Sequence, residues 1–253
     1  MTVRINLALQ GGGAHGAFTW GVLERLLDEP GIEVAGISGT SAGALNGAAF
    51  KAGMVDAGRA GARAQLEGLW RQVGAVGDWR MQPWMTTLTP LARVAGEVAE
   101  ALMPVSPQGL AAQVFSPYAW GAAYRNPLEP VVRRFRFDRV CAAEPPALFV
   151  SATNVRTGKI RVFEGPELST EAILASACLP TIFQAVEFAD PRTGQVEAFW
   201  DGGYAGNPAL FPLFAPELPD DIVVVSINPL YRADLPRTPV EIQSRINEIS
   251  FNA

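Results

Sequence analysis

Five residues around position 41 have the types and spacing of a nucleophilic turn. Gly39-Thr40-Ser41-Ala42-Gly43 matches G-x-S-x-G, in which a serine sits on a sharp bend between a strand and a helix. Gly39 and Gly43 are needed because side chains there would clash with neighbouring backbone. The bend exposes the hydroxyl at the helix N-terminus, where the dipole favours developing negative charge. The pattern predicts Ser41 as a nucleophile; the alternative is a glycine-rich turn with a bystander serine.

A second glycine-rich stretch, Gly11-Gly12-Gly13-Ala14-His15-Gly16, follows the first predicted strand. As a dinucleotide-binding loop it would require an acid at the end of the second strand, about 20 residues on. Glu33 precedes that strand and lies at its wrong end. In the other interpretation, the N–H groups of Gly11, Gly12 and Gly13 form an oxyanion hole, where each donor typically lowers the barrier by about 2.7 to 4 kcal/mol. We favour the oxyanion hole.

A nucleophilic serine needs a base, and the chain has a single histidine, His15. His15 precedes the serine and stands inside the glycine loop, so we interpret it as a surface or helix-start residue. A carboxylate must then accept the proton. Asp201 ends a predicted strand and is followed by Gly202 and Gly203, which leaves its carboxylate within reach. Burial would have to raise its pKa from about 3.9. The alternative is an ordinary Asp-Gly turn.

The elements around these motifs predict an α/β protein. The first fifty residues read as strand 3–9, glycine loop, helix 17–28, strand 34–37, tight turn, and a helix through about residue 52. This βαβα order implies a mainly parallel sheet with right-handed crossovers, and it sets the two glycine-containing loops side by side. Later strands are expected at 147–154, 159–163, 186–188, 196–200 and, strongly buried, at 222–228, with helices at 171–178 and 241–251.

Residues 54–140 are predicted to form a mostly helical insertion interrupted by prolines. Two stretches in it are apolar, namely 79–85 and 115–120. They could wall an acyl-chain pocket or form a lid that meets a lipid surface. The alternative is that these helices pack their apolar sides on the sheet.

Composition bounds the remaining possibilities. The 253 residues suit one domain, 1–253, and the 49% hydrophobic content excludes disorder. A net charge of −5 without a basic block argues against nucleic-acid binding. Two cysteines, Cys141 and Cys178, and one histidine argue against a disulfide scaffold or a His-rich metal site. Without a signal peptide or an apolar run of about 18 to 20 residues, we expect a cytoplasmic location. The last predicted helix reaches the final residues, which suggests a clipped C-terminus.

Taken together, the three motifs resemble the bacterial patatin-like phospholipases. Ala175–Pro180, Asn207-Pro208 and Arg245–Ile249 also fit, so the resemblance spans nearly the whole chain. It implies a three-layer α/β/α fold with a mainly parallel central sheet. It also implies a Ser–Asp dyad without a histidine base. The residues carried over are the nucleophile Ser41, the base Asp201, the oxyanion-hole residues Gly11, Gly12 and Gly13, and the motif positions Gly16, Gly39, Gly43, Gly202 and Gly203.

One departure concerns His15, because the family often has Arg or Lys at that position. A group that titrates near pH 6.5 replaces a permanent cation, which favours neutral esters or lower pH. We expect a serine hydrolase of lipid acyl esters, of lipase, esterase or lysophospholipase type, that works through an acyl-enzyme. No cofactor or metal is expected, and the partners are a lipid or ester substrate and a peripheral membrane surface. The alternatives are an acyltransferase with the same dyad, a non-catalytic lipid-binding relative, and a dinucleotide-binding oxidoreductase.

Overall fold

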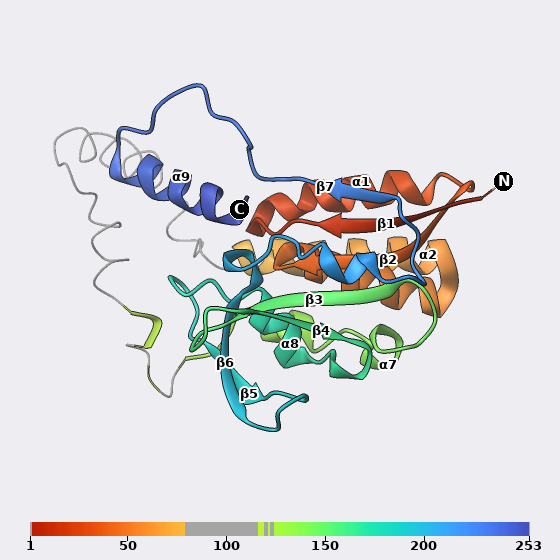
Figure 1. Cartoon of the computed structure of the whole chain (residues 1–253), viewed down its shortest axis with the longest axis horizontal. Coiled ribbons are helices and arrows are strands. Elements are labelled where there is room, and N and C mark those ends of the chain that lie inside the picture. The colour runs from red at the N-terminus through yellow and green to blue at the C-terminus, as the bar shows by residue number, and fades with distance from the viewer. Residues whose placement is uncertain (1, 79–115, 119–120, 122–123, 253) are drawn as a thin grey trace.

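The computed structural model describes residues 2–78, 116–118, 121 and 124–252, and in these it forms a mixed α/β fold (Figure 1). Its strands are β1 (Val3–Leu9), β2 (Ile32–Thr40), β3 (Ala147–Asn154), β4 (Ile160–Glu164), β5 (Val186–Ala189), β6 (Val196–Asp201) and β7 (Ile222–Val225). Its α-helices are α1 (Gly16–Leu27), α2 (Ala42–Asp78), α6 (Glu129–Val132), α7 (Phe137–Val140), α8 (Thr170–Ser176) and α9 (Pro239–Phe251).

The strands form one seven-stranded sheet in the order β5-β6-β3-β2-β1-β7, with β4 paired to β3 beside this path. The four strands β7, β1, β2 and β3 run parallel, whereas β4, β5 and β6 pair antiparallel. This confirms the predicted α/β class with a largely parallel central sheet. The predicted strand at 159–163 is confirmed as β4, and the predicted pair at 186–188 and 196–200 is confirmed as β5 and β6. β4 pairs antiparallel with β3, and β5 pairs antiparallel with β6.

Alternating side chains divide the core between the two faces of the sheet. On β1, Leu7 and Leu9 point to the face covered by α1, α2 and α8, and Ala8 points to the other. The first face holds the larger cluster, with Phe50 of α2 and Ile173 of α8 fully buried. The second face is covered by residues 209–218, which include the 3-10 turn η5 (Phe211–Phe214).

Helix α2 is longer than the helix predicted from residue 42 to about 52. It consists of two helical parts that join at a kink, where Ala57 and Gly58 leave the helical conformation and Gly58 has a φ of 62°. The two parts pack closely, since a Cβ on Gly53 would lie 2.4 Å from the backbone of Ala62. Of the predicted apolar stretches, 79–85 and most of 115–120 lie outside the described residues.

The prediction of a buried strand at 222–228 was wrong in both length and burial. β7 ends at Val225, and Val223 and Val224 are 40% and 49% exposed. The reason is its place in the sheet, because β7 is an edge strand that pairs with β1 alone among the described strands. A run of β-branched residues favours a strand but carries no information about which edge is covered.

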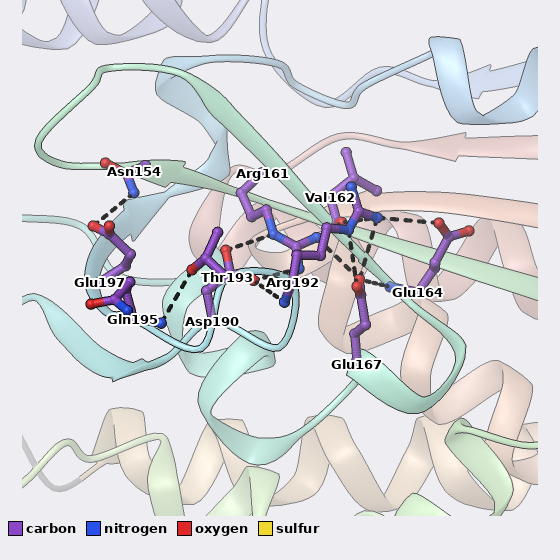
Figure 2. A network of polar contacts seen from close by, with 10 residues as sticks. All are labelled: Asn154, Arg161, Val162, Glu164, Glu167, Asp190, Arg192, Thr193, Gln195 and Glu197. Atoms are coloured by element: carbon purple, nitrogen blue, oxygen red, sulfur yellow. Dashed lines mark hydrogen bonds and ion pairs between the residues drawn. The ribbon is translucent and has the colours of Figure 1, made fainter.

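A network of charged side chains fixes β4 against the β5–β6 hairpin, on which Asp201 stands (Figure 2). Arg161 of β4 donates two hydrogen bonds to Asp190, at 2.9 and 2.7 Å, and a third to Glu167 at 3.1 Å. Arg192 adds contacts to Glu167 and Glu164. Arg161 and Asp190 are almost buried, and Arg161 holds the pKa of Asp190 below its usual range. A buried arginine–carboxylate pair joined by two hydrogen bonds fixes the relative orientation of the two side chains and also stabilises the contact.

Candidate active site

Ser41 lies on the turn between β2 and α2 in a strained conformation. Its φ of 55° makes it the one non-glycine residue with a positive φ among those described, at a typical cost of about 1–3 kcal/mol. The flanking glycines allow this turn, since a Cβ on Gly43 would lie 2.1 Å from the carbonyl oxygen of Leu9. A Cβ on Gly39 would lie 2.7 Å from the carbonyl oxygen of Gly43. The Ser41 N–H donates to Ser176 Oγ of α8 at 2.9 Å, which fixes the turn from the other side.

Asp201 is the last residue of β6 and is fully buried. Its Oδ1 accepts a hydrogen bond from the N–H of Gly203 at 2.8 Å, whereas Oδ2 has no partner among the described residues. The two following glycines are required by packing. A Cβ on Gly202 would lie 2.2 Å from the carbonyl oxygen of Ser151, and one on Gly203 would lie 2.2 Å from the ring of Phe251. Asp201 thus begins an Asp-Gly turn, as the alternative interpretation had it, but the turn is buried.

The register of β3 brings Ser41 and Asp201 together. β4 occupies one edge of β3 along residues 149–153, so β2 and β6 must share the other edge. β2 pairs with 147–151 and β6 pairs with 152–154, and the two strands therefore meet end to end. Thr40 is level with Ser151, and Asp201 is level with the next residue of β3. Ser41, which follows Thr40, consequently turns into α2 beside the carboxylate.

Burial makes the Asp201 carboxyl a weaker acid than an exposed carboxyl. Loss of solvent raises its pKa from 3.8 to about 7, although the Gly203 N–H and, to a smaller degree, the nearby Ser41 hydroxyl oppose the rise. The neighbouring Cys178 accepts the Asp201 N–H through its carbonyl oxygen at 2.8 Å. Burial also raises the pKa of the Cys178 thiol, to about 12, so this cysteine stays protonated. A carboxyl with a pKa near neutrality can exchange a proton under physiological conditions.

The glycine loop lies directly against Ser41, but Gly11 is not an open donor. A Cβ on Gly11 would lie 2.7 Å from Ser41 Cβ, so glycine is needed for contact. The Gly11 N–H donates to Asn207 Oδ1 at 2.6 Å, and the Gly11 carbonyl accepts from Asn207 Nδ2 at 3.2 Å. This corrects the prediction of three oxyanion donors, because Asn207 already uses one of them. The N–H groups of Gly12 and Gly13 have no acceptor within the described part of the chain.

Gln10 holds the glycine loop in place. Its Oε1 accepts hydrogen bonds from the N–H groups of Ile227 and Asn228 at 2.9 and 3.1 Å, and its Nε2 donates to Asn252 Oδ1 at 3.2 Å. Asn228 Nδ2 in turn donates to the Gly11 carbonyl at 2.8 Å. The segment after β7 and the end of α9 therefore support the loop that faces Ser41. Sequence reasoning missed this role, because Gln10 and its partners are far apart in the chain.

A buried amide joins the far end of the loop to the start of α2. Asn46 Nδ2 donates to the carbonyls of Gly16 and Ala42, both at 3.0 Å, and Trp70 Nε1 donates to Asn46 Oδ1 at 2.9 Å. Gly16 leaves room for this approach, since a Cβ there would lie 2.6 Å from the Cβ of Ala42. The sequence offered no signal for Asn46, whose partners are backbone carbonyls.

His15 takes no part in this hydrogen-bonded network. It is exposed, and within the described chain its side chain makes no hydrogen bond or ion pair. It lines a hollow of about 460 Å³ together with Ala14, Ala17, Phe18, Ser226 and Ile227. The hollow begins at the glycine loop, because a Cβ on Gly12 would lie 2.8 Å from Ile227. Its wall is mostly apolar.

No group of three or more His, Cys, Asp or Glu side chains in the described residues is arranged to hold a metal ion. No helix in the same part of the chain is both long enough and apolar enough to cross a membrane. Cys141 and Cys178 are both free thiols, and Cys178 is buried.

A family model described as "patatin-like phospholipase" matches residues 7–214, which hold Ser41, Asp201 and the glycine loop. The chain belongs to the patatin-like phospholipase family. This membership supports lipid acyl hydrolase activity in general terms. No curated protein matches the chain. Among solved structures, the chain is similar to VipD from Legionella pneumophila, with 14% identity and a TM-score of 0.49. The match covers 88% of this chain and 49% of VipD, so the chain spans about half of that protein.

Proposed function

We propose that this patatin-like chain is a serine hydrolase of lipid acyl esters, with Ser41 as nucleophile and Asp201 as base. Ser41 Oγ attacks the ester carbonyl carbon, and its proton passes to the Asp201 carboxylate. The tetrahedral intermediate collapses as the C–O bond to the alcohol breaks, and Asp201 returns the proton to the departing alcohol. Water then attacks the acyl-enzyme with Asp201 again as base, which releases the carboxylic acid and restores Ser41.

The observation that carries this proposal is the unpaired Oδ2 of Asp201. It belongs to a fully buried carboxyl with a pKa of about 7, at the point where β6 meets the Ser41 turn. A buried acceptor without a partner is costly, so its retention calls for an explanation. The unpaired oxygen is explained if Asp201 is the base, because Oδ2 must then be free to accept the proton of the Ser41 hydroxyl. Asp201 also needs no third residue to orient it, because the Gly203 N–H fixes its other oxygen.

In this mechanism the oxyanion is stabilised by the N–H groups of Gly12 and Gly13, together with the positive end of α2. Gly11 has a positioning role instead, since it contacts Ser41 and is held by Asn207. The apolar hollow beside the loop would take a neutral part of the ester. Because the residues that line this hollow include no lysine or arginine, we expect neutral esters to be preferred over anionic ones.

A fluorophosphonate probe, which labels activated serines, tests the assignment directly. Labelling and p-nitrophenyl ester hydrolysis are expected in the natural chain, and both should be lost in Ser41→Ala. Asp201→Asn should lose ester hydrolysis while remaining folded. Ser250→Ala is the matched control, because the Ser250 hydroxyl bonds only to Ile246 of its own helix. Hydrolysis retained by Asp201→Asn would assign the base elsewhere, and absent labelling of the natural chain would favour a non-catalytic lipid-binding relative.

An acyltransferase would use the same dyad and differ only in the acceptor of the acyl group. Product analysis separates the two reactions, because water yields free fatty acid and an added alcohol yields a new ester. The preference for neutral esters is tested with His15→Arg. If the position sets charge preference, this variant should gain activity on anionic lysophospholipids relative to neutral esters; an unchanged ratio removes that part of the proposal.

A further inference from the structure

The last helix of the chain presents an aliphatic stripe to solvent. Ile242, Ile246 and Ile249 of α9 follow one another at intervals of four and three residues, which places them on one face of the helix. They are 43%, 51% and 56% exposed. Polar residues described as exposed on the same helix include Glu241, Gln243, Ser244 and Asn247. A stripe of this kind on a folded helix marks an interaction surface.

The exposure of this stripe does not come from a loosely held helix. At its N-terminus, Thr238 and Glu241 form a capping box, in which each side chain accepts the other's backbone N–H. Along its length, Glu248 is paired with both Arg245 and Arg232, and Arg232 belongs to the preceding loop. The helix is therefore fixed with its isoleucines facing outward.

The other end of α9 is built into the candidate active site. Phe251 fills the space that Gly203 leaves open, and its ring meets that of Tyr204 edge-on at 5.3 Å. Asn252 bonds to Gln10, which supports the glycine loop. In Figure 1, α9 extends from this point beyond the end of β1, away from the sheet. The stripe therefore lies on a helix whose C-terminal end contacts the residues next to Asp201 and the glycine loop.

We propose that α9 docks this protein onto a lipid surface of neutral net charge, with Ile242, Ile246 and Ile249 inserted at the boundary between headgroups and acyl chains. This inference rests on the proposed function, because it supplies the route by which lipid esters reach Ser41. Leu230, Tyr231 and Leu235 in the loop before α9 are also exposed, and Arg232 of that loop pairs with Glu248 of α9. Tyrosine and arginine beside aliphatic residues are typical of segments at membrane interfaces.

The charge of the segment favours this occupant. Residues 229–252 contain three arginines (Arg232, Arg237 and Arg245) and three acids (Asp234, Glu241 and Glu248), so they are neutral overall, while the chain carries −5. An anionic surface would be repelled by the protein as a whole, and this segment offers no basic excess to overcome that repulsion. A phosphatidylcholine surface has neither drawback. Aliphatic insertion, rather than charge, then supplies the affinity.

The test uses flotation with phosphatidylcholine vesicles, with the full chain carrying Ser41→Ala so that lipid is not consumed. The natural α9 should bind, and the variant Ile242→Ser, Ile246→Ser, Ile249→Ser should bind at least about tenfold more weakly, since the loss of all three must exceed the contribution of a single fully inserted isoleucine, which is about tenfold. The matched control is Phe211→Ser with Phe214→Ser, two residues of η5 that are at least as exposed and should leave binding unchanged. Adding phosphatidylglycerol should not strengthen binding.

Hydrolysis in the chain that retains Ser41 separates this inference from the proposed function. The triple variant should cleave a soluble short-chain ester at the natural rate and lose about tenfold on vesicle lipid. Equal vesicle binding by the triple variant and the natural chain would overturn the inference, as would binding that requires phosphatidylglycerol. A dimer in light scattering that the three serines convert to monomer, without vesicle binding, would reassign the stripe to self-association. If no ester is cleaved, the proposed function fails, yet flotation still decides the docking.

Discussion

Asp201→Asn offers a test of the raised pKa of Asp201 that requires no substrate. Asparagine has nearly the same shape as aspartic acid but does not titrate, so the variant keeps the buried site and removes its charge. In the folded protein the Asp201 carboxyl has a pKa of about 7, compared with 3.8 for an unperturbed carboxyl. Between these values the folded chain binds a proton that the unfolded chain has released. The free energy of unfolding therefore falls as pH rises through this window and is level above it.

The size of the effect follows from the width of the window. One pKa unit corresponds to about 1.4 kcal/mol, so through this one group the natural chain should lose about 2 kcal/mol of unfolding free energy between pH 5 and pH 7 and nearly 3 kcal/mol by about pH 8. Asp201 is fully buried, so solvent does not screen the effect. The variant lacks this loss, while every other titrating group is common to both proteins. Its stability relative to the natural chain should therefore rise by about 3 kcal/mol from pH 5 to pH 8.

Urea denaturation of both proteins at pH 5, 6, 7 and 8 measures this difference. The Asn amide will add a constant offset, because its N–H₂ group faces the position where Oδ2 has no partner. This offset does not depend on pH, so the test is how the difference in unfolding free energy between the two proteins changes with pH. A difference that stays the same from pH 5 to pH 8 would mean that Asp201 ionises normally. The assignment of a near-neutral base would then be refuted.

Three further outcomes are expected. The kcat/KM of ester hydrolysis should rise with pH through about 7 and level off above it, since the base must be ionised; a profile flat from pH 5 to 9 would contradict this. Ser176→Ala should lower the free energy of unfolding by about 1–3 kcal/mol and reduce kcat, because the Ser41 N–H loses its buried acceptor, whereas Ser176→Thr should keep most activity. Asn207→Ala should reduce kcat by releasing Gly11, and unchanged kinetics would show that the loop holds its shape without it.

The elements nearest the motifs were predicted well from the sequence because local signals agree there. The strands 3–9 and 147–154 have the predicted bounds, since apolar runs end at glycine or polar residues. The turn at Ser41 was predicted because its glycines have a steric reason that depends only on the turn itself. The helix expected at 241–251 is also present, as α9.

Other features depend on parts of the chain that meet only in the fold. In isolation, Asp201 resembled a surface turn, and its burial follows from strand pairing that no local pattern encodes. Gly11 was expected to face the substrate, but Asn207, far away in sequence, takes its N–H. The same holds for Gln10, whose partners lie after β7 and at the end of α9. The exposure of Val223 reflects the absence of a neighbour beyond β7 among the described strands, which composition does not reveal.

The end-to-end meeting of β2 and β6 on one edge of β3 has a consequence for biosynthesis. Ser41 leaves the ribosome long before the carboxylate that would activate it, and a lone serine hydroxyl is a weak nucleophile. Under the proposed chemistry, a growing or C-terminally degraded chain cannot attack the lipids of its own cell. Lipolysis would switch on only when the last antiparallel hairpin closes, which makes completion of folding the safeguard.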